Sequence, residues 1–254
     1  MTKILVLNPN STESMTDGMV SAIKSAGLDK VVDIDQYTAP SSAPVSINND
    51  QDIQASEASV IEDMRNKLGN GTLGASSYDA ILVACYSVHS LVDSLADLLP
   101  TNAITGIFEA SVSTAQLLLR PHSDQKWGIV TTGKFWEDHL THGVKSFLGQ
   151  DAASDNQRFA GVFSTGLNAS DFHHVPQEEV TARLKSATTK LLQTGDVRCV
   201  VMGCGGMAGL ERVIRDTATE VYGEERARRI FVVDGVKAGV LQLEQTVQSK
   251  RIFG

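Results

Sequence analysis

Two of the three cysteines follow segments that have the length and composition of buried strands. Cys85 follows the apolar run Ala80–Ala84, and Cys204 follows Cys199–Met202. A thiolate can act as a general base and a thiol as a general acid. Two cysteines on opposite sides of one carbon can therefore remove a proton from one face and return a proton to the other. Such a pair would invert a carbon that carries an acidic hydrogen, without a cofactor, pyridoxal lysine or metal.

The residues after Cys204 suit this chemistry. Gly205 and Gly206 leave room for a substrate to approach the thiol and expose backbone N–H groups that can hold a developing enolate oxygen. A free thiol has a pKa of about 8.5, and a helix N-terminus lowers that value. We expect helix N-termini after both strands to bring the thiol pKa values toward neutral pH.

Other candidate residues have simpler interpretations. Cys199 lies inside an apolar run and is predicted to be a core residue. His89 follows Cys85 by four residues and could pair with it on one helical turn, but no further ligands stand at zinc-like spacing, so no metal site is predicted. The adjacent His173 and His174 are expected in a surface loop.

Two acidic residues come after predicted strands. Glu109 and Asp234 are placed at the ends of matching strands, where a carboxylate either faces a cleft or caps the next helix. Of these two roles, we expect capping.

Composition narrows the class of protein. The chain has 254 residues, enough for one large or two small domains, with 42% hydrophobic and 20% charged residues. Its net charge of −8 argues against partners such as nucleic acid or an anionic membrane. Three cysteines do not make a disulfide framework, and the first apolar run, Ile4–Leu7, is too short for a signal peptide or membrane span. We expect a cytoplasmic protein with reduced thiols and a small-molecule substrate.

Short apolar runs alternate with helical patterns along the chain, which is typical of an α/β protein with parallel sheets. Asn10 followed by Glu13 predicts a capping box at the start of the first helix. The segment 38–58 is expected to be a loop, followed by a helix near Glu57–Leu68, and Asn70–Ser77 is a glycine-rich connection. The predicted strands are Ile4–Leu7, Ala80–Ala84, Trp127–Val130, Phe159–Phe163, Cys199–Met202 and Ile230–Val233.

A weak internal repeat divides the chain into two similar halves. The segments that begin at Lys3, Tyr78 and Ile107 overlay those that begin at Lys126, Val197 and Val232, with offsets of 123, 119 and 125 residues. We predict two pseudosymmetric α/β halves. The first spans 1–115 and is completed by a C-terminal helix at about 236–254, and the second spans 116–235. Both cysteines should then face one cleft between the halves.

Several segments resemble the hydantoin racemase family of the aspartate/glutamate racemase superfamily. They are Asn8-Pro9-Asn10-Ser11, Cys85, Gly106–Ala110, the run from Gly203 to Gly209, and Val233–Val236. The resemblance covers nearly the whole chain. It implies a cofactor-independent racemase of 5-substituted hydantoins, with allantoin as a related substrate, on an Asp/Glu racemase-like fold that is usually oligomeric.

The resemblance also implies the roles of individual residues. Cys85 and Cys204 correspond to the catalytic pair. Many hydantoin racemases carry aspartate shortly after the first cysteine, where this chain has Tyr86-Ser87-Val88-His89, so the substituent on the substrate stays open. The candidate substrate-binding residues are neutral groups near the cysteines and strand ends: Asn8, Asn10, Ser11, Ser87, Val88, Thr131, Thr132, Gly205 and Gly206.

Alternative functions remain open at this stage. Only Lys134 supplies a nearby cation, which favours a neutral cyclic ureide over an aspartate, glutamate or other amino-acid carboxylate. A ligand-binding protein that kept the scaffold without turnover is a third possibility. Gly203-x-Gly205-x-x-Ala208 partly matches a dinucleotide fingerprint, but space for only one more strand follows it.

Overall fold

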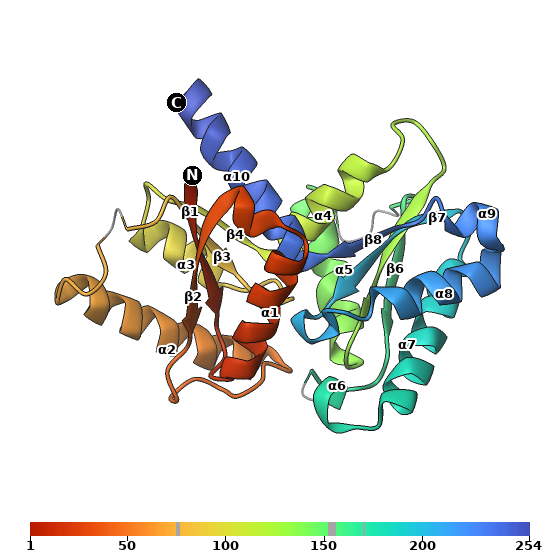
Figure 1. The fold of residues 1–254 in the computed structure, drawn as a ribbon, viewed down its shortest axis with the longest axis horizontal. Helices are drawn as coiled ribbons and strands as arrows, with labels where there is room; N and C mark the ends of the chain where they lie inside the picture. Colours follow the sequence, from red (N-terminus) through yellow and green to blue (C-terminus); the bar gives the residue numbers. More distant parts are fainter. Residues whose placement is uncertain (75–76, 152–155, 170) are drawn as a thin grey trace. The chain divides into compact units, whose positions relative to one another are not determined.

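The computed structural model describes residues 1–74, 77–151, 156–169 and 171–254. Within these ranges the chain forms two compact units, Met1–Ala110 with Val236–Gly254, and Ser111–Gly235. The chain passes between the units inside two helices, α4 (Ile107–Leu118) and α10 (Gly235–Phe253) (Figure 1). Each unit is built on a parallel four-stranded sheet, which confirms the predicted α/β class.

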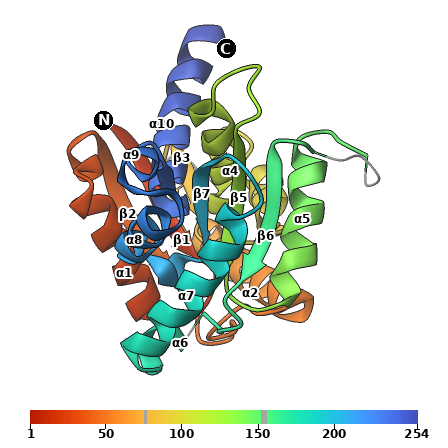
Figure 2. The ribbon, with the colours of Figure 1, turned by 90° about the vertical axis from the view of Figure 1, so that its right-hand side faces the viewer.

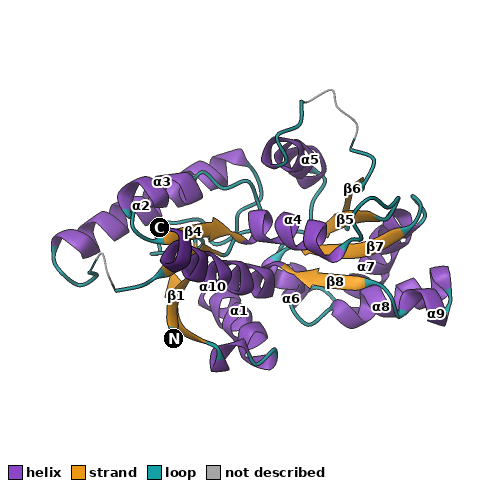
Figure 3. Ribbon diagram, turned by 90° about the horizontal axis from the view of Figure 1, so that it is seen from above, coloured by secondary structure: helices purple, strands orange, loops and turns teal. Residues whose placement is uncertain are grey.

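The first sheet has the order β2 (Val32–Thr38), β1 (Thr2–Asn8), β3 (Ala80–Val83), β4 (Ala103–Gly106). Its central strands carry the buried apolar runs 4–7 and 80–83, as expected for strands covered on both faces. Helices α2 (Asp50–Gly69) and α3 (Leu91–Leu98) lie on one side of the sheet (Figure 3). Helices α1 (Glu13–Ser25) and α10 lie on the other side.

Packing on the two faces of this sheet explains why the C-terminal helix belongs to the first unit. Leu7 of β1 and Val83 of β3 join a core cluster with Met64 of α2. On the opposite face, α10 packs so closely on β3 that a Cβ at Gly239 would lie 2.4 Å from a methyl group of Leu82. The C-terminal helix α10 therefore packs directly on the sheet that the N-terminal part of the chain forms.

The second sheet has the order β6 (Phe159–Ser164), β5 (Lys126–Thr131), β7 (Val197–Gly203), β8 (Phe231–Asp234). Buried side chains of α7 (Gln177–Leu192) and α8 (Glu211–Tyr222) share a core with residues of β5 and β7. Helix α5 (Phe135–Phe147) lies on the side of the sheet away from α7 (Figure 2). The remaining short helices are α6 (Asp171–His174), α9 (Glu224–Ala227) and the 3₁₀ turns η1 (Leu28–Lys30) and η2 (Gly205–Met207).

Strand registers define which residues of the two units are equivalent. Leu7 of β1 is paired with Val83 of β3, and Val130 of β5 is paired with Met202 of β7. The offsets are 123 residues for β1 and β5 and 119 for β3 and β7, as in the first two overlays of the sequence repeat. Cys85 and Cys204 stand two residues beyond Val83 and Met202 respectively, so they occupy matching positions in the two sheets.

The third sequence overlay was wrong by three residues. Val83 is paired with Gly106 and Met202 with Asp234, which gives an offset of 128 rather than 125. Asp234 does end its strand, but Glu109 lies in the first turn of α4. Both overlaid segments are apolar, so their composition could not fix the register.

Other local expectations also differ from the structure. The residue in the N-cap position of α1 is Thr12 rather than Asn10, and its side chain makes no capping hydrogen bond. Helix α2 begins at Asp50, within the predicted loop, because the side chain of Asn49 accepts a hydrogen bond from the backbone N–H of Asp52. The edge strands β2 and β4 were not among the predicted strands. His173 and His174 belong to helix α6 instead of a loop. Part of the Asn70–Ser77 connection, residues 75–76, lies outside the described residues.

In the described part of the chain, no helix has the length and apolar character needed to cross a membrane.

Candidate active site

Cys85 lies in a loop just past the carboxyl end of β3. Residues between this cysteine and Ser90 form no helical turn, since α3 begins only at Leu91. The Cys85 thiol is half-buried, and the hydroxyl of Ser87 lies 3.4 Å from its sulfur and donates to it. Ser87 is almost fully buried, whereas the neighbouring Val88 is exposed. This donor would favour the thiolate form of Cys85.

The loop after β1 is organised by Asn8. The buried amide of this residue donates to Oδ1 of Asn10 and to Oγ1 of Thr16, both at 3.0 Å, and its own oxygen accepts from the backbone N–H of Asn10 at 3.2 Å. The Ser11 hydroxyl donates to the carbonyl of Ala43 at 3.1 Å. These groups are occupied in holding the loop. Among the described residues, the Asn10 amide nitrogen has only the sulfur of Met15, at 3.5 Å, as an acceptor.

His89 connects the Cys85 loop to the Asn8 loop through α2. Its Nδ1 accepts from the backbone N–H of Leu91 at 3.2 Å, so the neutral ring carries its proton on Nε2. That nitrogen lies 3.4 Å from Oγ of Ser56, whose hydroxyl donates to the carbonyl of Pro9 at 2.6 Å. Both His89 and Ser56 are buried. The two loops at the carboxyl edge of the first sheet are thus linked by side chains.

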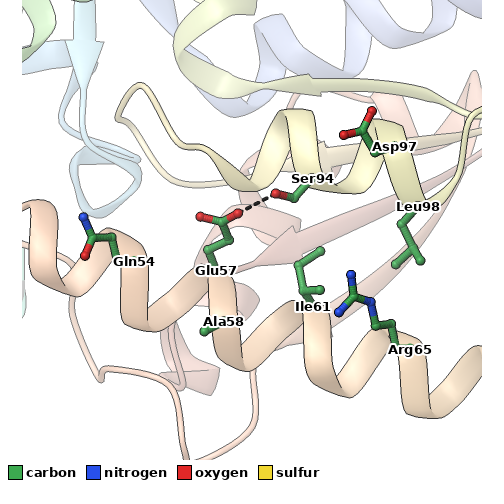
Figure 4. Close-up of a pocket in the computed structure, with 8 residues that line it drawn as sticks. All are labelled: Gln54, Glu57, Ala58, Ile61, Arg65, Ser94, Asp97 and Leu98. Atoms are coloured by element: carbon green, nitrogen blue, oxygen red, sulfur yellow. Dashed lines mark hydrogen bonds between the residues drawn. The ribbon is translucent and has the colours of Figure 1, made fainter.

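Glu57, the residue after Ser56 in α2, connects this helix to α3. The carboxylate of Glu57 accepts from the hydroxyls of Ser90 and Ser94 at the start of α3, and Figure 4 shows the contact with Ser94. Burial acts to raise the pKa of Glu57, but these two hydrogen bonds, together with a smaller electrostatic effect of His89, outweigh burial and lower the pKa. Glu57 therefore stays ionised and clamps α3 to α2.

A pocket of about 450 Å³ lies between these two helices (Figure 4). It contains no cysteine and none of the predicted site residues. Its lining residues are Gln54, Glu57, Ala58, Ile61, Arg65, Ser94, Asp97 and Leu98.

Cys204 caps the short turn η2 in the second unit. Its sulfur accepts from the backbone N–H of Gly206 at 3.3 Å. Burial nevertheless raises the pKa of this thiol to about 11, against the lowering effect of the N–H groups of Gly206 and Met207. The expected lowering of the Cys204 pKa by a helix N-terminus was therefore wrong, because one 3₁₀ turn supplies too few N–H groups to offset burial.

The end of β5 supports the Cys204 turn. The hydroxyl of Thr131 donates to the carbonyl of Gly203 at 2.8 Å. A Cβ at Gly203 would lie 2.9 Å from Cβ of Thr131 and 3.0 Å from the carbonyl oxygen of Val130, so this close approach requires glycine. The hydroxyl of Thr132 has no hydrogen-bond partner among the described residues, although the residue is buried. Thr131 is therefore engaged in structure, whereas Thr132 keeps its hydroxyl for other contacts.

Two further expectations concern Glu109 and Cys199. The Glu109 carboxylate accepts from the backbone N–H of Gly106, three residues earlier, which is the reciprocal half of a capping box. Its capping role is as expected, although its position is not. Burial raises its pKa to about 7. Cys199 is fully buried, and burial raises its pKa to about 12.

Each unit thus gathers one half of the predicted set at the carboxyl edge of its sheet. The first brings together the Asn8 loop and the Cys85 loop, and the second brings together Thr131–Thr132 and the Cys204 turn. Sequence reasoning missed Ser56, Glu57 and Thr16. Single serine, glutamate and threonine residues carry no motif, and two of these three lie in the segment predicted to be a loop.

Comparison with known proteins agrees with this architecture of two parallel α/β units. A family model described as Asp/Glu/Hydantoin racemase matches residues 4–243. The chain therefore belongs to the Asp/Glu/Hydantoin racemase family, which places it among the isomerases.

The individual relatives share about a fifth to a third of their residues with this chain. An uncharacterized protein of Schizosaccharomyces pombe is 31% identical, with 98% of this chain and 93% of the relative covered. A hydantoin racemase of Pseudomonas sp. (strain NS671) is 26% identical, with 96% and 86% covered. The solved structure of allantoin racemase from Pseudomonas fluorescens has a TM-score of 0.74 at 22% identity, with 98% and 92% covered. At this identity, the structural likeness concerns the fold.

Proposed function

We propose that this protein racemises 5-substituted hydantoins or allantoin by a two-base mechanism in which Cys85 and Cys204 are the catalytic residues. The observation that carries the proposal is the strand register, which puts the two thiols at equivalent positions of two similar sheets. The relatives named hydantoin racemase and allantoin racemase indicate the substrate class.

In this mechanism one thiolate removes the proton from the ring stereocentre and the opposite thiol delivers a proton to the other face. The reaction requires both sulfurs near attack distance of that carbon, about 3–3.5 Å. The raised pKa of Cys204 makes it the thiol of the resting enzyme and hence the acid for one enantiomer. Cys85, with the Ser87 hydroxyl on its sulfur, takes the role of the base. For the other enantiomer the roles are exchanged.

The groups beside the thiols suit a neutral ring with amide edges. The Asn10 amide and the Thr132 hydroxyl can donate to ring carbonyls. Lys134 is exposed and forms an ion pair with Glu137, so its charge is already matched. A charged amino-acid substrate would have no other lysine or arginine close in sequence to either thiol as a cationic partner.

The test uses pure enantiomers of 5-benzylhydantoin and of allantoin in deuterium oxide, with racemisation followed by circular dichroism and exchange at the stereocentre by NMR. Cys85→Ser and Cys204→Ser should each lower racemisation about 10²- to 10⁴-fold. Exchange should be lost unequally for the two enantiomers, because each thiol faces one of them. The matched control is Cys199→Ala, which removes a thiol from a strand interior and should leave racemisation within a few-fold of the unaltered protein.

Wild-type-like racemisation in both serine variants would refute the thiol mechanism. Turnover of aspartate or glutamate with none of the ureides would refute the substrate class. Tight ureide binding with no exchange in the unaltered protein would indicate a binding protein instead.

A further inference from the structure

The second unit carries a pocket at the amino ends of its strands, the edge of the sheet opposite to Cys204. It has a volume of about 370 Å³, within the range of small-molecule sites. The pocket is lined by Leu118, Arg120, Gln125, Arg198, Arg229 and Phe231. We call it the arginine pocket. Three of its lining residues are arginines and none is acidic, in a chain whose net charge is −8.

The sheet order explains why these arginines converge. Arg198 is the second residue of the interior strand β7, and Phe231 opens its neighbour β8. Arg120 follows α4 in the connection that leads to β5, on the other side of β7. The backbone N–H of Arg120 donates to the side chain of Gln125 at 3.0 Å, which fixes the loop that presents it.

The charges of the arginine pocket are incompletely matched within the unit. One oxygen of Asp196 serves two guanidiniums, lying 3.0 Å from Nε of Arg198 and 2.9 Å from Nη2 of Arg226. Nη1 of Arg198 is buried and has no hydrogen-bond partner among the described residues. Such a group costs free energy unless an acceptor reaches it. Arg229 makes only an exposed pair with Glu225, and the guanidinium of Arg120 makes no ion pair in the described part of the chain.

An apolar wall completes the pocket. Phe231 is 44% exposed although it belongs to a strand, and Leu118 lines the same space. Guanidiniums bind carboxylate and phosphate oxygens through paired N–H groups, and an exposed ring offers a face for a planar or apolar body. The required ligand chemistry is therefore an oxyanion joined to an apolar or aromatic group.

We propose that the arginine pocket binds a small organic oxyanion, a carboxylate or phosphate ester, at a site separate from the catalytic thiols. Arg198 lies five residues before the end of β7 and Cys204 directly follows that strand, so the two sites are about 20 Å apart along it. The inference does not depend on the proposed racemisation.

The experiment measures binding of phenyl phosphate to the full chain by isothermal titration calorimetry, with phenol as the uncharged control. One phenyl phosphate should bind per chain and phenol should not. Arg198→Gln and Arg120→Gln should each weaken binding about tenfold or more, as expected for loss of a charge-assisted hydrogen bond. Arg120 is exposed, so its variant folds even where Arg198→Gln does not.

Arg212→Gln is the matched control, because Arg212 is an exposed arginine of α8 outside the pocket, paired with Asp216 at 3.6 Å. This variant should bind like the unaltered protein, and so should the Cys85→Ser, Cys204→Ser double variant. Equal weakening by Arg212→Gln, or equal binding of phenol, would overturn the proposal. Dissociation of an oligomer by Arg120→Gln with unchanged phenyl phosphate binding, seen by light scattering, would also overturn it and make this face an interface between copies.

Discussion

The segment that carries Cys85 is held by side chains, whereas the turn that carries Cys204 is held by its own backbone. In the first unit, Ser87, His89, Ser56 and Glu57 connect the loop to α2 and to the loop after β1. In the second unit, backbone N–H groups contact the sulfur, and a glycine lets β7 approach β5. The two thiols occupy matching positions in the two sheets, but different kinds of contact position them.

Because different contacts position the two thiols, we expect the two units to respond differently to mutation. A thiol positioned by side-chain hydrogen bonds should respond in graded steps as single polar groups are removed. A thiol positioned by backbone should tolerate such changes nearby but respond strongly to any added Cβ. It should also keep the neutral form that burial imposes on it.

The largest expected effect concerns the reactivity of Cys204. Burial favours the neutral thiol, so a raised pKa of about 11 leaves roughly one thiolate in a thousand at pH 8. In a Cys85→Ser, Cys199→Ala background, iodoacetamide should alkylate Cys204 about a hundredfold more slowly than a free cysteine at pH 8. The rate should rise about tenfold per pH unit up to pH 10. Mass spectrometry measures the rate, and a plateau below pH 9 would contradict the raised pKa.

The next effect is on stability. Gly203→Ala would place a Cβ 2.7 Å from Cγ2 of Ile129, 2.9 Å from Cβ of Thr131 and 3.0 Å from the carbonyl oxygen of Val130. These atoms lie on or next to the backbone of β5 and have little freedom to move, so the substitution should cost about 1–3 kcal/mol of the free energy of unfolding. Gly106→Ala is the comparison in the first unit, because its closest contact is the carboxylate at the far end of the Glu109 side chain, which can shift at the expense of its capping hydrogen bond. Urea denaturation should show the larger loss for Gly203→Ala, and an equal or reversed order would break the contrast.

Strands with continuous apolar runs could be predicted from the sequence, whereas β2 and β4, the edge strands of the first sheet, could not. β1, β3, β5 and β7 are interior strands and carry buried apolar runs, which periodicity detects directly. β2 contains two aspartates and a glutamine, and β4 contains a threonine and a glycine among its four residues, so neither shows a continuous apolar run. The matching of Cys85 with Cys204 could be predicted because the overlaid segments of the internal repeat that begin at Tyr78 and Val197 both end in a cysteine.

The supports of the site could not be predicted in the same way. The link from His89 to Pro9 passes through Ser56, a residue of another helix, and depends on which side chains the packing of α2 on the first sheet brings within hydrogen-bond distance. The pKa of Cys204 likewise depends on burial, which follows from the packed structure and not from the Gly-Cys-Gly-Gly motif. A sequence motif can identify a reactive group, but the burial and the neighbours of that group depend on how the chain packs in three dimensions.

A smaller effect is expected from the side-chain link in the first unit. Ser56→Ala removes the hydroxyl between His89 and Pro9 and leaves two buried polar groups without this partner, at a cost of about 1–3 kcal/mol. The hydantoin exchange that depends on Cys85 should fall about tenfold at saturating substrate while the KM changes little. Ser42→Ala, at an exposed hydroxyl that contacts Ser59, is the control and should leave both quantities unchanged. Equal activity of the two variants would show that the link does not position Cys85.

The smallest expected effect distinguishes the two ways of stabilising a thiolate. Ser87→Ala removes the hydroxyl at 3.4 Å from the sulfur of Cys85, a long hydrogen bond worth about 0.5–1.5 kcal/mol. Alkylation of Cys85 at pH 8 should slow a few-fold, because the lost hydrogen-bond donor favoured the thiolate. Alkylation of Cys204 in the same variant serves as the internal control, since its donors are backbone N–H groups that this substitution does not touch. A few-fold change at Cys204 with none at Cys85 would mean that Ser87 does not stabilise the thiolate of its own loop, and the first unit would then depend on the link through Ser56 alone.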